Sequence, residues 1–480
     1  MRQALSTRIC LLAVLFGEAT WRNLQDRPVP AVAKTTFLLR RLISIRKETE
    51  LSTTSEEGPG RVASTQPAGH HYGQTGIWFI GGRGSVATTA TLGLAAIAGG
   101  FADTTGCVTA REVFNSVPLP PYKDLVIGGH DITDLSMVKR AESLVESGMI
   151  PPRLLDALRK SLEEADARIK PGYTADDHSG SQAEAARRLA GDIADFRASN
   201  GLRRVIVIDV ASTEPPVAAA PEFEDPALLE AALEDSGRAL LPASSVSAYA
   251  AVLAGAPYIC FTPSTAMNVP ALRHLAATKA LPTAGQDGKT GQTWLRSVLA
   301  PAFSARGLRI LSWSGTNLLG GGDGATLADP EAVASKLQSK NRGLQELAQA
   351  AVTPLHIDNV PDLGETKVAW DHVNVEGFLG SRLSLQTTWS AYDSMLAAPM
   401  VLDLARLMAL ADAAGESGEI TALGFFFKDP WGSDEFAFAD QNEELVGWAE
   451  STGRKITGSV SRAEAKPVTP AETPDGTAPE

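Results

Sequence analysis

Short runs of mostly apolar, β-branched residues recur along the chain and constrain its fold more than any other feature. Strands that are apolar along their whole length are buried on both faces, as in a parallel sheet covered by helices. Amphipathic or apolar helical patterns at 184–196, 227–233 and 246–253 separate several of the runs. The pattern therefore predicts an α/β protein with a Rossmann-like, doubly wound parallel sheet. The runs are 77–80, 125–127, 205–210, 258–261 and 308–312.

A different pattern occupies the region between 299 and 395. Residues 383–389 alternate apolar and polar side chains, which is typical of a half-exposed antiparallel strand. We interpret 299–395 as an inserted α+β domain, and 75–298 as the first part of the Rossmann-like domain. A strand at 423–427 and a helix at 443–449 would return the chain to the parallel sheet over 396–458.

The two ends of the chain lack such patterns. Residues 1–74 are rich in Arg, Ser, Thr and Glu and are expected to be a disordered leader or a start assigned too far upstream. The apolar run at 9–16, behind Arg2 and Arg8, leaves a short signal-peptide core as the alternative. Residues 459–480, rich in Pro, Thr, Glu and Ala, are expected to form a disordered tail.

Charge and cysteine content exclude several classes of protein. Lys and Arg number 43 against 56 Asp and Glu, so the net charge of −13 gives no basic excess for general nucleic-acid binding. The three cysteines (Cys10, Cys107 and Cys260) are too few and too distant for a disulfide framework or a Cys-only metal site. They suit a reducing, cytoplasmic compartment. No run reaches the ~18 apolar residues of a membrane-spanning helix, so we expect no membrane partner.

A glycine turn follows the first predicted strand. Gly82-x-Gly84-x-x-Ala87 fits the G-x-G-x-x-G/A pattern between a strand and a helix of small residues. Backbone N–H groups at such a helix N-terminus hold a dinucleotide pyrophosphate. An ordinary glycine turn without a ligand is the alternative. The candidate cofactor contacts of this turn are Gly81, Gly82, Arg83, Gly84, Ser85 and Val86.

Polar residues also follow the other predicted strands, where a doubly wound sheet places its ligand. Each could instead be an ordinary turn residue or helix cap. Their recurrence at successive strand ends favours a shared site. These residues are Asp131, Ser212, Thr213 and Thr262.

Lysines lie beside glycines, hydroxyls or aromatics in the C-terminal half. Lys336 and Lys340 are four apart on a predicted helix and share one face, which suggests a cationic pocket for an oxyanion, with a solvated pair as the alternative. Lys428 follows three phenylalanines, where partial desolvation would tune it for proton transfer. Residues 287–293 offer hydroxyls, glycines and an amide at a helix N-terminus, which predicts a second anion site.

The ordered motifs, taken together, resemble the inositol-3-phosphate synthase (myo-inositol-1-phosphate synthase) family over about residues 76–450. The resemblance rests on several blocks in family order rather than on one motif. These blocks are 124–132, 287–293 with 296–299, 335–341, 360–367, 393–399 and 428–430.

This resemblance implies an NAD-dependent isomerase of inositol biosynthesis that cyclises glucose 6-phosphate to inositol 3-phosphate. In the family, oxidation at C5 allows enolisation at C6, aldol closure onto C1 and re-reduction at C5. It further implies a homo-oligomer, commonly a tetramer formed through the inserted domain at 299–395, which would have both a catalytic and an oligomerisation role. We assign no metal ligand. The implied catalytic residues are Lys336, Lys340, Lys367, Lys428 and Asp287. The implied phosphate ligands are Thr290, Gly291, Gln292, Thr293 and Lys340. The implied NAD contacts are Asp131, Ser212, Thr213, Thr262, Asp323, Asp393 and Ser394.

The sequence departs from the family pattern mainly in its cofactor loops. The family's Gly-Asn-Asn-Asp-Gly loop is Gly320-Gly321-Gly322-Asp323-Gly324 here, and Ser212 replaces an asparagine. The lysine set is complete. Two alternatives therefore stay open: a divergent NAD-dependent cyclase, epimerase or dehydrogenase acting on another sugar phosphate, and an NAD-binding scaffold without catalysis.

Overall fold

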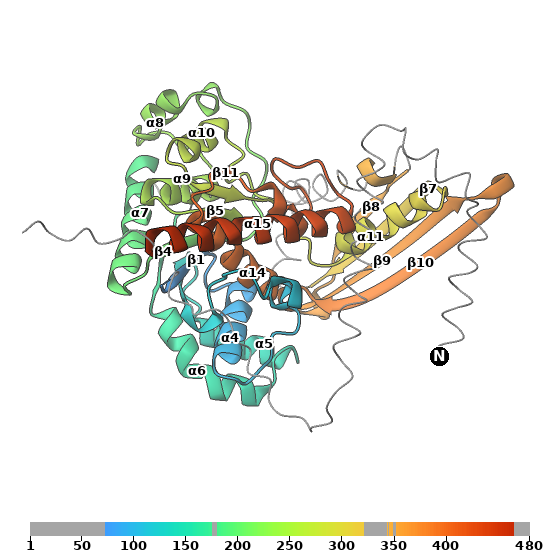
Figure 1. Ribbon diagram of the computed structural model, residues 1–480, viewed down its shortest axis with the longest axis horizontal. Helices are drawn as coiled ribbons and strands as arrows, with labels where there is room; N and C mark the ends of the chain where they lie inside the picture. Colours follow the sequence, from blue (N-terminus) through green and yellow to red (C-terminus); the bar gives the residue numbers. More distant parts are fainter. Residues whose placement is uncertain (1–72, 175–179, 321–342, 344, 349–351, 465–480) are drawn as a thin grey trace, which may run out of the picture. The chain divides into compact units, whose positions relative to one another are not determined.

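The computed structural model describes residues 73–174, 180–320, 343, 345–348 and 352–464. Seven strands form a sheet in the order β11-β6-β5-β4-β1-β2-β3, and every pairing between them is parallel (Figure 1). This confirms the predicted doubly wound sheet. The strands are β1 (Thr75–Ile80), β2 (Leu125–Asp131), β3 (Ile169–Pro171), β4 (Arg204–Asp209), β5 (Tyr258–Cys260), β6 (Pro282–Ala284) and β11 (Gly418–Glu419).

The sheet reverses its winding direction at β1. This strand pairs with β2 on one side and β4 on the other, so Ile80 lies in register with both His130 and Asp209. Connections from β1 and from β4 therefore leave the sheet on opposite sides. In open α/β sheets the crevice beyond the carboxyl ends of the strands at such a switch point is the ligand site.

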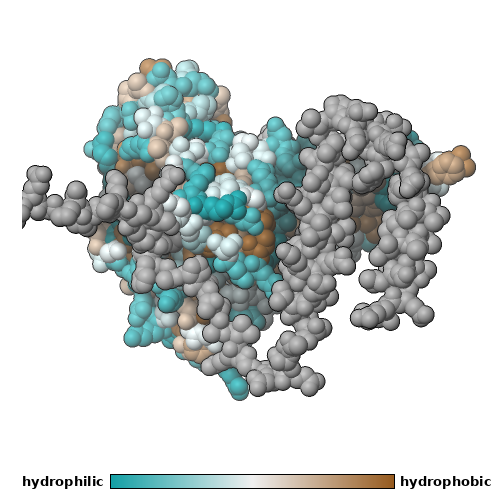
Figure 2. Space-filling model, in the orientation of Figure 1, coloured by the Kyte–Doolittle hydropathy of each residue, from teal (hydrophilic) through white to brown (hydrophobic). Residues whose placement is uncertain are grey.

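A second sheet has the order β10-β9-β7-β8, with β7–β8 parallel and the other pairs antiparallel. One face packs on helix α11 (Gln292–Ala305) through buried residues such as Trp313 and Val373. At the β9–β10 turn, Phe378 and Leu379 are 86% and 89% exposed, and Figure 2 shows a hydrophobic tip at the end of this hairpin. The strands are β7 (Arg309–Leu319), β8 (Leu355–Asn359), β9 (Thr366–Glu376) and β10 (Arg382–Tyr392).

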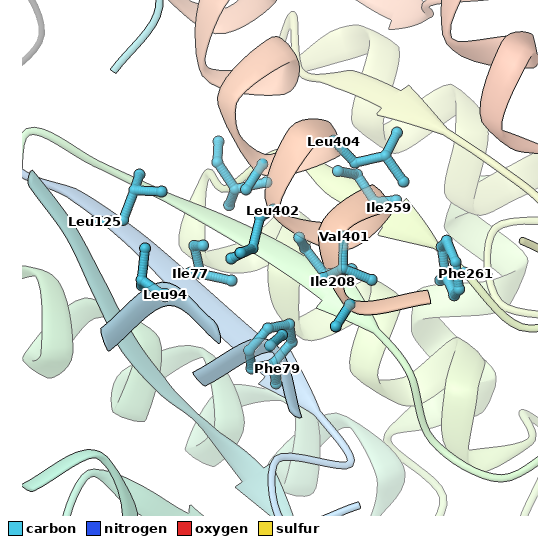
Figure 3. Close-up of a cluster of buried hydrophobic side chains, with 14 of the residues drawn as sticks. Ile77, Phe79, Leu94, Leu125, Ile208, Ile259, Phe261, Val401, Leu402 and Leu404 are labelled. Atoms are coloured by element: carbon cyan, nitrogen blue, oxygen red, sulfur yellow. The ribbon is translucent and has the colours of Figure 1, made fainter. Parts of the chain in front are cut away.

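Apolar clusters cover both faces of the first sheet. Ile77, Phe79 and Ile208 face a cluster that includes Leu94 and Leu402 from the helices above them (Figure 3). The helices of this face are α4 (Ser85–Ala98), α5 (Met137–Glu146), α6 (Pro152–Asp166), α14 (Asp393–Ala413) and α15 (Phe438–Glu464). The opposite face is covered by α7 (Gln182–Ser199), α8 (Pro226–Leu233), α9 (Ala243–Ala254) and α10 (Pro270–Thr278).

Helix α14 is apolar on nearly all sides. By length and composition it could cross a membrane, but 78% of its most apolar window is buried inside the protein. A helix that is hydrophobic all round is typical of the centre of a large core. Its first residue, Asp393, reaches the site described below.

The structure contradicts one predicted strand and adds three short ones. Residues 423–427 were expected to form a strand, but Thr421–Phe426 is a 3₁₀ helix, η7, and the chain returns to the sheet through β11. A short, fully buried apolar run does not distinguish a strand from a buried helical turn, which explains the error. The run at 308–312 begins β7 and therefore belongs to the second sheet. Strands β3, β6 and β11 are too short to give a pattern.

Candidate active site

The glycine turn between β1 and α4 is shaped by backbone contacts. Gly81 has φ +84°, and a Cβ there would meet the Cα of Ala211 at 2.8 Å, so only glycine fits. The amides of Gly81 and Gly82 both donate to the carbonyl of His130, each at 2.9 Å. No side chain caps α4, whose N-cap is Gly84. The uncapped N-terminus and the absence of a side chain at Gly81 fit a dinucleotide pyrophosphate.

Asp131 secures the same turn from the end of β2. Its carboxylate accepts the Arg83 amide at 2.6 Å and the Thr133 amide at 2.8 Å. The Arg83 guanidinium does not line the cavity, because it binds Asp166 and the carbonyl of Thr133, both at 2.8 Å. Arg83 therefore stabilises the turn through both its side chain and its backbone amide.

Arg140 is a cavity residue that sequence reasoning missed. It lies in α5, its Nε donates to the carbonyl of Arg83 at 3.3 Å, and it lines the cavity beside Gly84 and Asp131. An arginine aimed at the glycine turn suits an anionic cofactor. Its helix gives no motif, so only the fold relates this residue to the turn.

One cavity of about 600 Å³ lies beyond the carboxyl ends of β1, β2, β4 and β5. This volume is within the range of small-molecule sites. Of the candidate residues, Gly82, Arg83, Gly291, Gln292 and Thr293 do not line it, and Asp323, Lys336 and Lys340 lie outside the described residues. The candidate residues that line it are Gly81, Gly84, Ser85, Val86, Asp131, Ser212, Thr213, Thr262, Asp287, Thr290, Lys367, Asp393, Ser394 and Lys428.

A buried ion pair joins Lys428 to Asp287 within this cavity. Their side chains are 2.6 Å apart, and the Lys428 amide also donates to the Asp287 carbonyl at 2.7 Å. Both residues are at most 5% exposed. Backbone hydrogen bonds between Gln286 and Asp429 extend the pairing of the two segments. The segments that carry Lys428 and Asp287 are therefore joined by backbone hydrogen bonds as well as by the ion pair.

A second lysine, Lys367, lies against the N-terminus of α14. Its Nζ is 3.2 Å from Asp393 Oδ2, while Thr290 Oγ1 donates to Asp393 Oδ1 at 2.8 Å. Lys367 is 4% exposed. A carboxylate in the first turn of a helix is stabilised by the helix dipole. The cavity thus contains two buried lysines, each oriented by an aspartate.

The N-terminus of α11 divides its predicted phosphate ligands into two groups. Thr290 lines the cavity, whereas the side-chain Nε2 of Gln292 donates to Asp371 Oδ2 at 2.9 Å within the buried network of the second sheet. Thr293 is 8% exposed, and its hydroxyl has no hydrogen-bond partner among the described residues. A Cβ on Gly291 would meet the Trp389 ring at 2.4 Å, so this glycine permits close packing.

Two carboxylates hold the loop that carries Ser212 and Thr213. Asp209 accepts the Ala211 amide at 3.1 Å and the Tyr258 hydroxyl at 2.8 Å, and burial raises its pKa to about 7. Glu214 accepts the Ser244 amide at 3.1 Å, and burial raises its pKa as well. A buried acid accepting hydrogen bonds from loop amides fixes the loop against the sheet.

Lys289 anchors the 287–293 segment on the side away from the cavity. Its ammonium donates to the Gln441 side-chain oxygen and lies 5.9 Å from the ring centroids of both Phe425 and Phe438. Burial lowers the pKa of Lys289 to about 7. This lysine does not line the cavity and joins residues 287–293 to α15.

Comparison with known proteins gives one consistent family. A family model labelled as NAD-binding and described as myo-inositol-1-phosphate synthase matches residues 75–449. Inositol-3-phosphate synthase 1 of Bacteroides thetaiotaomicron is 31% identical, with 80% of this chain and 96% of that protein aligned. The human inositol-3-phosphate synthase 1 is 30% identical over 65% of this chain, which spans 61% of the human protein's length.

Solved structures agree at the level of fold. Inositol-3-phosphate synthase of Caenorhabditis elegans superposes with a TM-score of 0.69 at 21% identity, covering 83% of this chain and 90% of that one. A myo-inositol-1-phosphate synthase-related protein of Thermotoga maritima has a TM-score of 0.62 at 21% identity, covering 78% and 98%.

Proposed function

The chain belongs to the myo-inositol-1-phosphate synthase family, and from that premise we propose that it converts glucose 6-phosphate to inositol 3-phosphate with NAD as a bound cofactor. The observation that carries the proposal is the meeting of a glycine turn and two lysine–aspartate pairs in one cavity. A dinucleotide site alone would suit many oxidoreductases. Buried ammonium groups beside it suit a reaction whose intermediates carry negative charge on oxygen.

The cofactor would be held at the switch point of the sheet. The N-terminus of α4 and Arg140 would face its phosphates, and Asp131 would accept a ribose hydroxyl. Ser212, Thr213 and Thr262 would line the adjoining strand ends. When bound, NAD supplies the reversible removal of a hydride from C5 of the sugar.

The two lysines would carry the proton and charge transfers on the sugar. A C5 ketone makes the C6 proton acidic, and its removal leaves negative charge on an enolate oxygen. Attack of C6 on the C1 aldehyde then creates an alkoxide. Lys367 and Lys428 would stabilise these oxyanions and exchange protons with them, and their aspartates hold both ammonium groups in place before the sugar binds.

The sugar phosphate would be bound at the N-terminus of α11. Thr290 lines the cavity there, and Thr293, which does not line it, follows in the first turn of the same helix with a hydroxyl that has no partner among the described residues. The family resemblance implies that Lys340 also binds the phosphate and that Lys336 acts with the other lysines in catalysis; both lie outside the described residues. It also supports a homo-oligomer, for which the exposed Phe378 and Leu379 of the β9–β10 turn offer an apolar contact.

Product analysis tests this function. Purified full-length protein is incubated with NAD⁺ and glucose 6-phosphate, and the product is identified by phosphorus and proton NMR. We expect an inositol phosphate without accumulation of NADH, because the hydride is returned. NADH formed in proportion to substrate would instead indicate a dehydrogenase. Absence of turnover together with tight NAD binding would indicate a scaffold. The Lys428→Ala variant is the negative control.

A further inference from the structure

Three side chains form a hydrogen-bonded line beneath the glycine turn. Trp78 Nε1 of β1 lies 2.9 Å from His130 Nδ1 of β2, and His130 Nε2 lies 3.2 Å from Asp192 Oδ2 of α7. Trp78 and His130 are 1% and 2% exposed. Their rings meet edge to face, with centroids 4.8 Å apart.

The hydrogen bonds to Trp78 and Asp192 determine the protonation state of the His130 imidazole. An indole N–H can only donate, so Nδ1 of His130 must accept and carries no proton. The proton of the neutral ring is therefore on Nε2 and is donated to Asp192. Burial lowers the pKa of His130, although Asp192 opposes that effect. The ring is thus neutral, in one tautomer and one orientation.

The backbone of the same residue holds the cofactor turn. The His130 carbonyl accepts the amides of Gly81 and Gly82, and the next residue, Asp131, accepts the amide of Arg83. Three consecutive amides of the turn therefore bind the last two residues of β2. The residue whose side chain is held by Trp78 and Asp192 is therefore the one whose carbonyl holds the turn.

Packing around Trp78 leaves its side chain little room to move. A Cβ on Gly128 would meet the Trp78 ring at 2.9 Å, and the ring centroids of Phe196 and Trp78 are 5.0 Å apart. The indole is therefore fixed between β2 and α7, and Nδ1 of His130 is the atom that accepts the indole N–H.

We propose that His130 is a positioning residue for the dinucleotide, and that its neutral, Trp78-bound ring keeps the glycine turn in the binding conformation. This inference rests on the proposed function. It predicts that protonation of the ring weakens NAD binding, because a proton on Nδ1 would face the indole N–H. The charged groups around the ring are Asp192 and Arg188 of α7, and Lys170 is its register partner on β3.

The test measures the dissociation constant of NAD for the full-length protein by calorimetry between pH 5 and pH 8. We expect wild-type affinity to fall about tenfold on acidification, the effect of losing one buried hydrogen bond. His130→Asn keeps an acceptor near the position of Nδ1 and cannot titrate, so its affinity should stay near the wild-type value at pH 8 and vary less with pH. His130→Leu should bind weakly at every pH.

Further variants separate positioning from folding. Trp78→Phe keeps the packed ring and removes only the N–H, so it should lower NAD affinity with little change in thermal unfolding. His274→Asn, at an exposed position, is the matched control and should behave as wild type. Binding by Trp78→Phe or by His130→Leu that equals wild-type binding at pH 8, where the ring is neutral, would overturn the inference alone. A wild-type chain that binds no NAD would overturn the proposed function with it.

Discussion

At the scale of single residues, the site depends on charges that are buried but paired. Lys428 and Asp287 are 141 residues apart in the chain, yet they share one backbone and one side-chain contact. Removing one partner of such a pair leaves an uncompensated charge, which is costly in a desolvated site. Each member is therefore expected to affect both the chemistry and the local structure.

Replacement of either cavity lysine should stop the reaction. Lys367→Ala and Lys428→Ala should each lower kcat at least about a hundredfold, because an oxyanion donor and proton carrier is lost. The dissociation constant of NAD should change less than about threefold, since neither lysine lies in the glycine turn. Steady-state kinetics and calorimetry measure the two effects, with exposed Lys160→Ala as control. Near-normal turnover in either variant would remove that lysine from the mechanism.

The hydroxyl of Thr293 gives a prediction about the substrate phosphate. Thr293→Val preserves shape and removes a buried hydroxyl that has no partner among the described residues, so unfolding should hardly change. If that hydroxyl binds phosphate, KM for glucose 6-phosphate should rise about tenfold. Thr278→Val, on the surface of α10, is the matched control. An unchanged KM would rule out a phosphate contact by this residue.

Burial of Lys289 should give the protein a measurable pH dependence of stability. The pKa of Lys289 is lowered from 10.5 to about 7, so between these values the unfolded chain binds a proton that the folded chain does not. Stability should therefore rise as pH increases from 7 to 10, and the gain should be lost as pH falls through about 7. Lys289→Met should remove this slope in urea unfolding, whereas Lys160→Met should keep it. Parallel curves for wild type and Lys289→Met would contradict the assignment.

At the scale of elements, the β1–turn–α4 unit depends on the close approach of its backbone to the residues that directly follow β4. Gly81 combines a positive φ with contact to Ala211, so the turn tolerates no side chain at that point. In contrast, a Cβ added at Gly93, within α4, would have no neighbouring atom within 4 Å. The two glycines therefore differ in what an added methyl group would do.

This difference makes a matched pair of substitutions. Gly81→Ala should weaken NAD binding at least tenfold and lower the free energy of unfolding by about 1 kcal/mol or more, through steric strain. Gly93→Ala should leave binding unchanged and raise that free energy by up to about 1 kcal/mol, since alanine is the better helix former. Calorimetry and urea unfolding measure both. Equal behaviour of the two variants would show that the turn does not need its close approach.

At the scale of the whole molecule, the cavity is assembled from segments that lie far apart in sequence. The glycine turn, the ends of β2, β4 and β5, the 287–290 loop and the start of α14 all border it. The switch point of the first sheet gathers the glycine turn and the ends of β2 and β4, and the start of β9 brings Lys367 to the same cavity. No single segment contains a complete site.

The apolar turn of the β9–β10 hairpin gives the prediction at this scale. Phe378→Ser with Leu379→Ser should lower the molar mass found by light scattering, because two highly exposed apolar side chains would no longer be buried between copies. Exposed Leu228→Ser, on α8, is the control. An oligomer of unchanged mass in the double variant would exclude the hairpin from the contact, and a monomeric wild type would contradict the proposed assembly.

Local pattern determined the fold class, the glycine turn and the polar strand-end residues that line the cavity, because hydrophobic period and turn chemistry depend on neighbours in the chain. Four of the five apolar runs lie in the parallel sheet, and Asp131, Ser212, Thr213 and Thr262 line the cavity at strand ends. The 3₁₀ helix at Thr421–Phe426 shows the limit of such patterns, since burial alone does not specify a strand.

Only the tertiary structure decided which polar side chains meet. It pairs Lys428 with Asp287 and Lys367 with Asp393, and it adds Arg140 to the cavity. It also directs Arg83 to Asp166 and Gln292 to Asp371, away from the cavity. These contacts depend on distances between segments that are far apart in the chain. A charged or amide side chain binds the partner that the fold brings within hydrogen-bonding distance, and local sequence does not specify that partner.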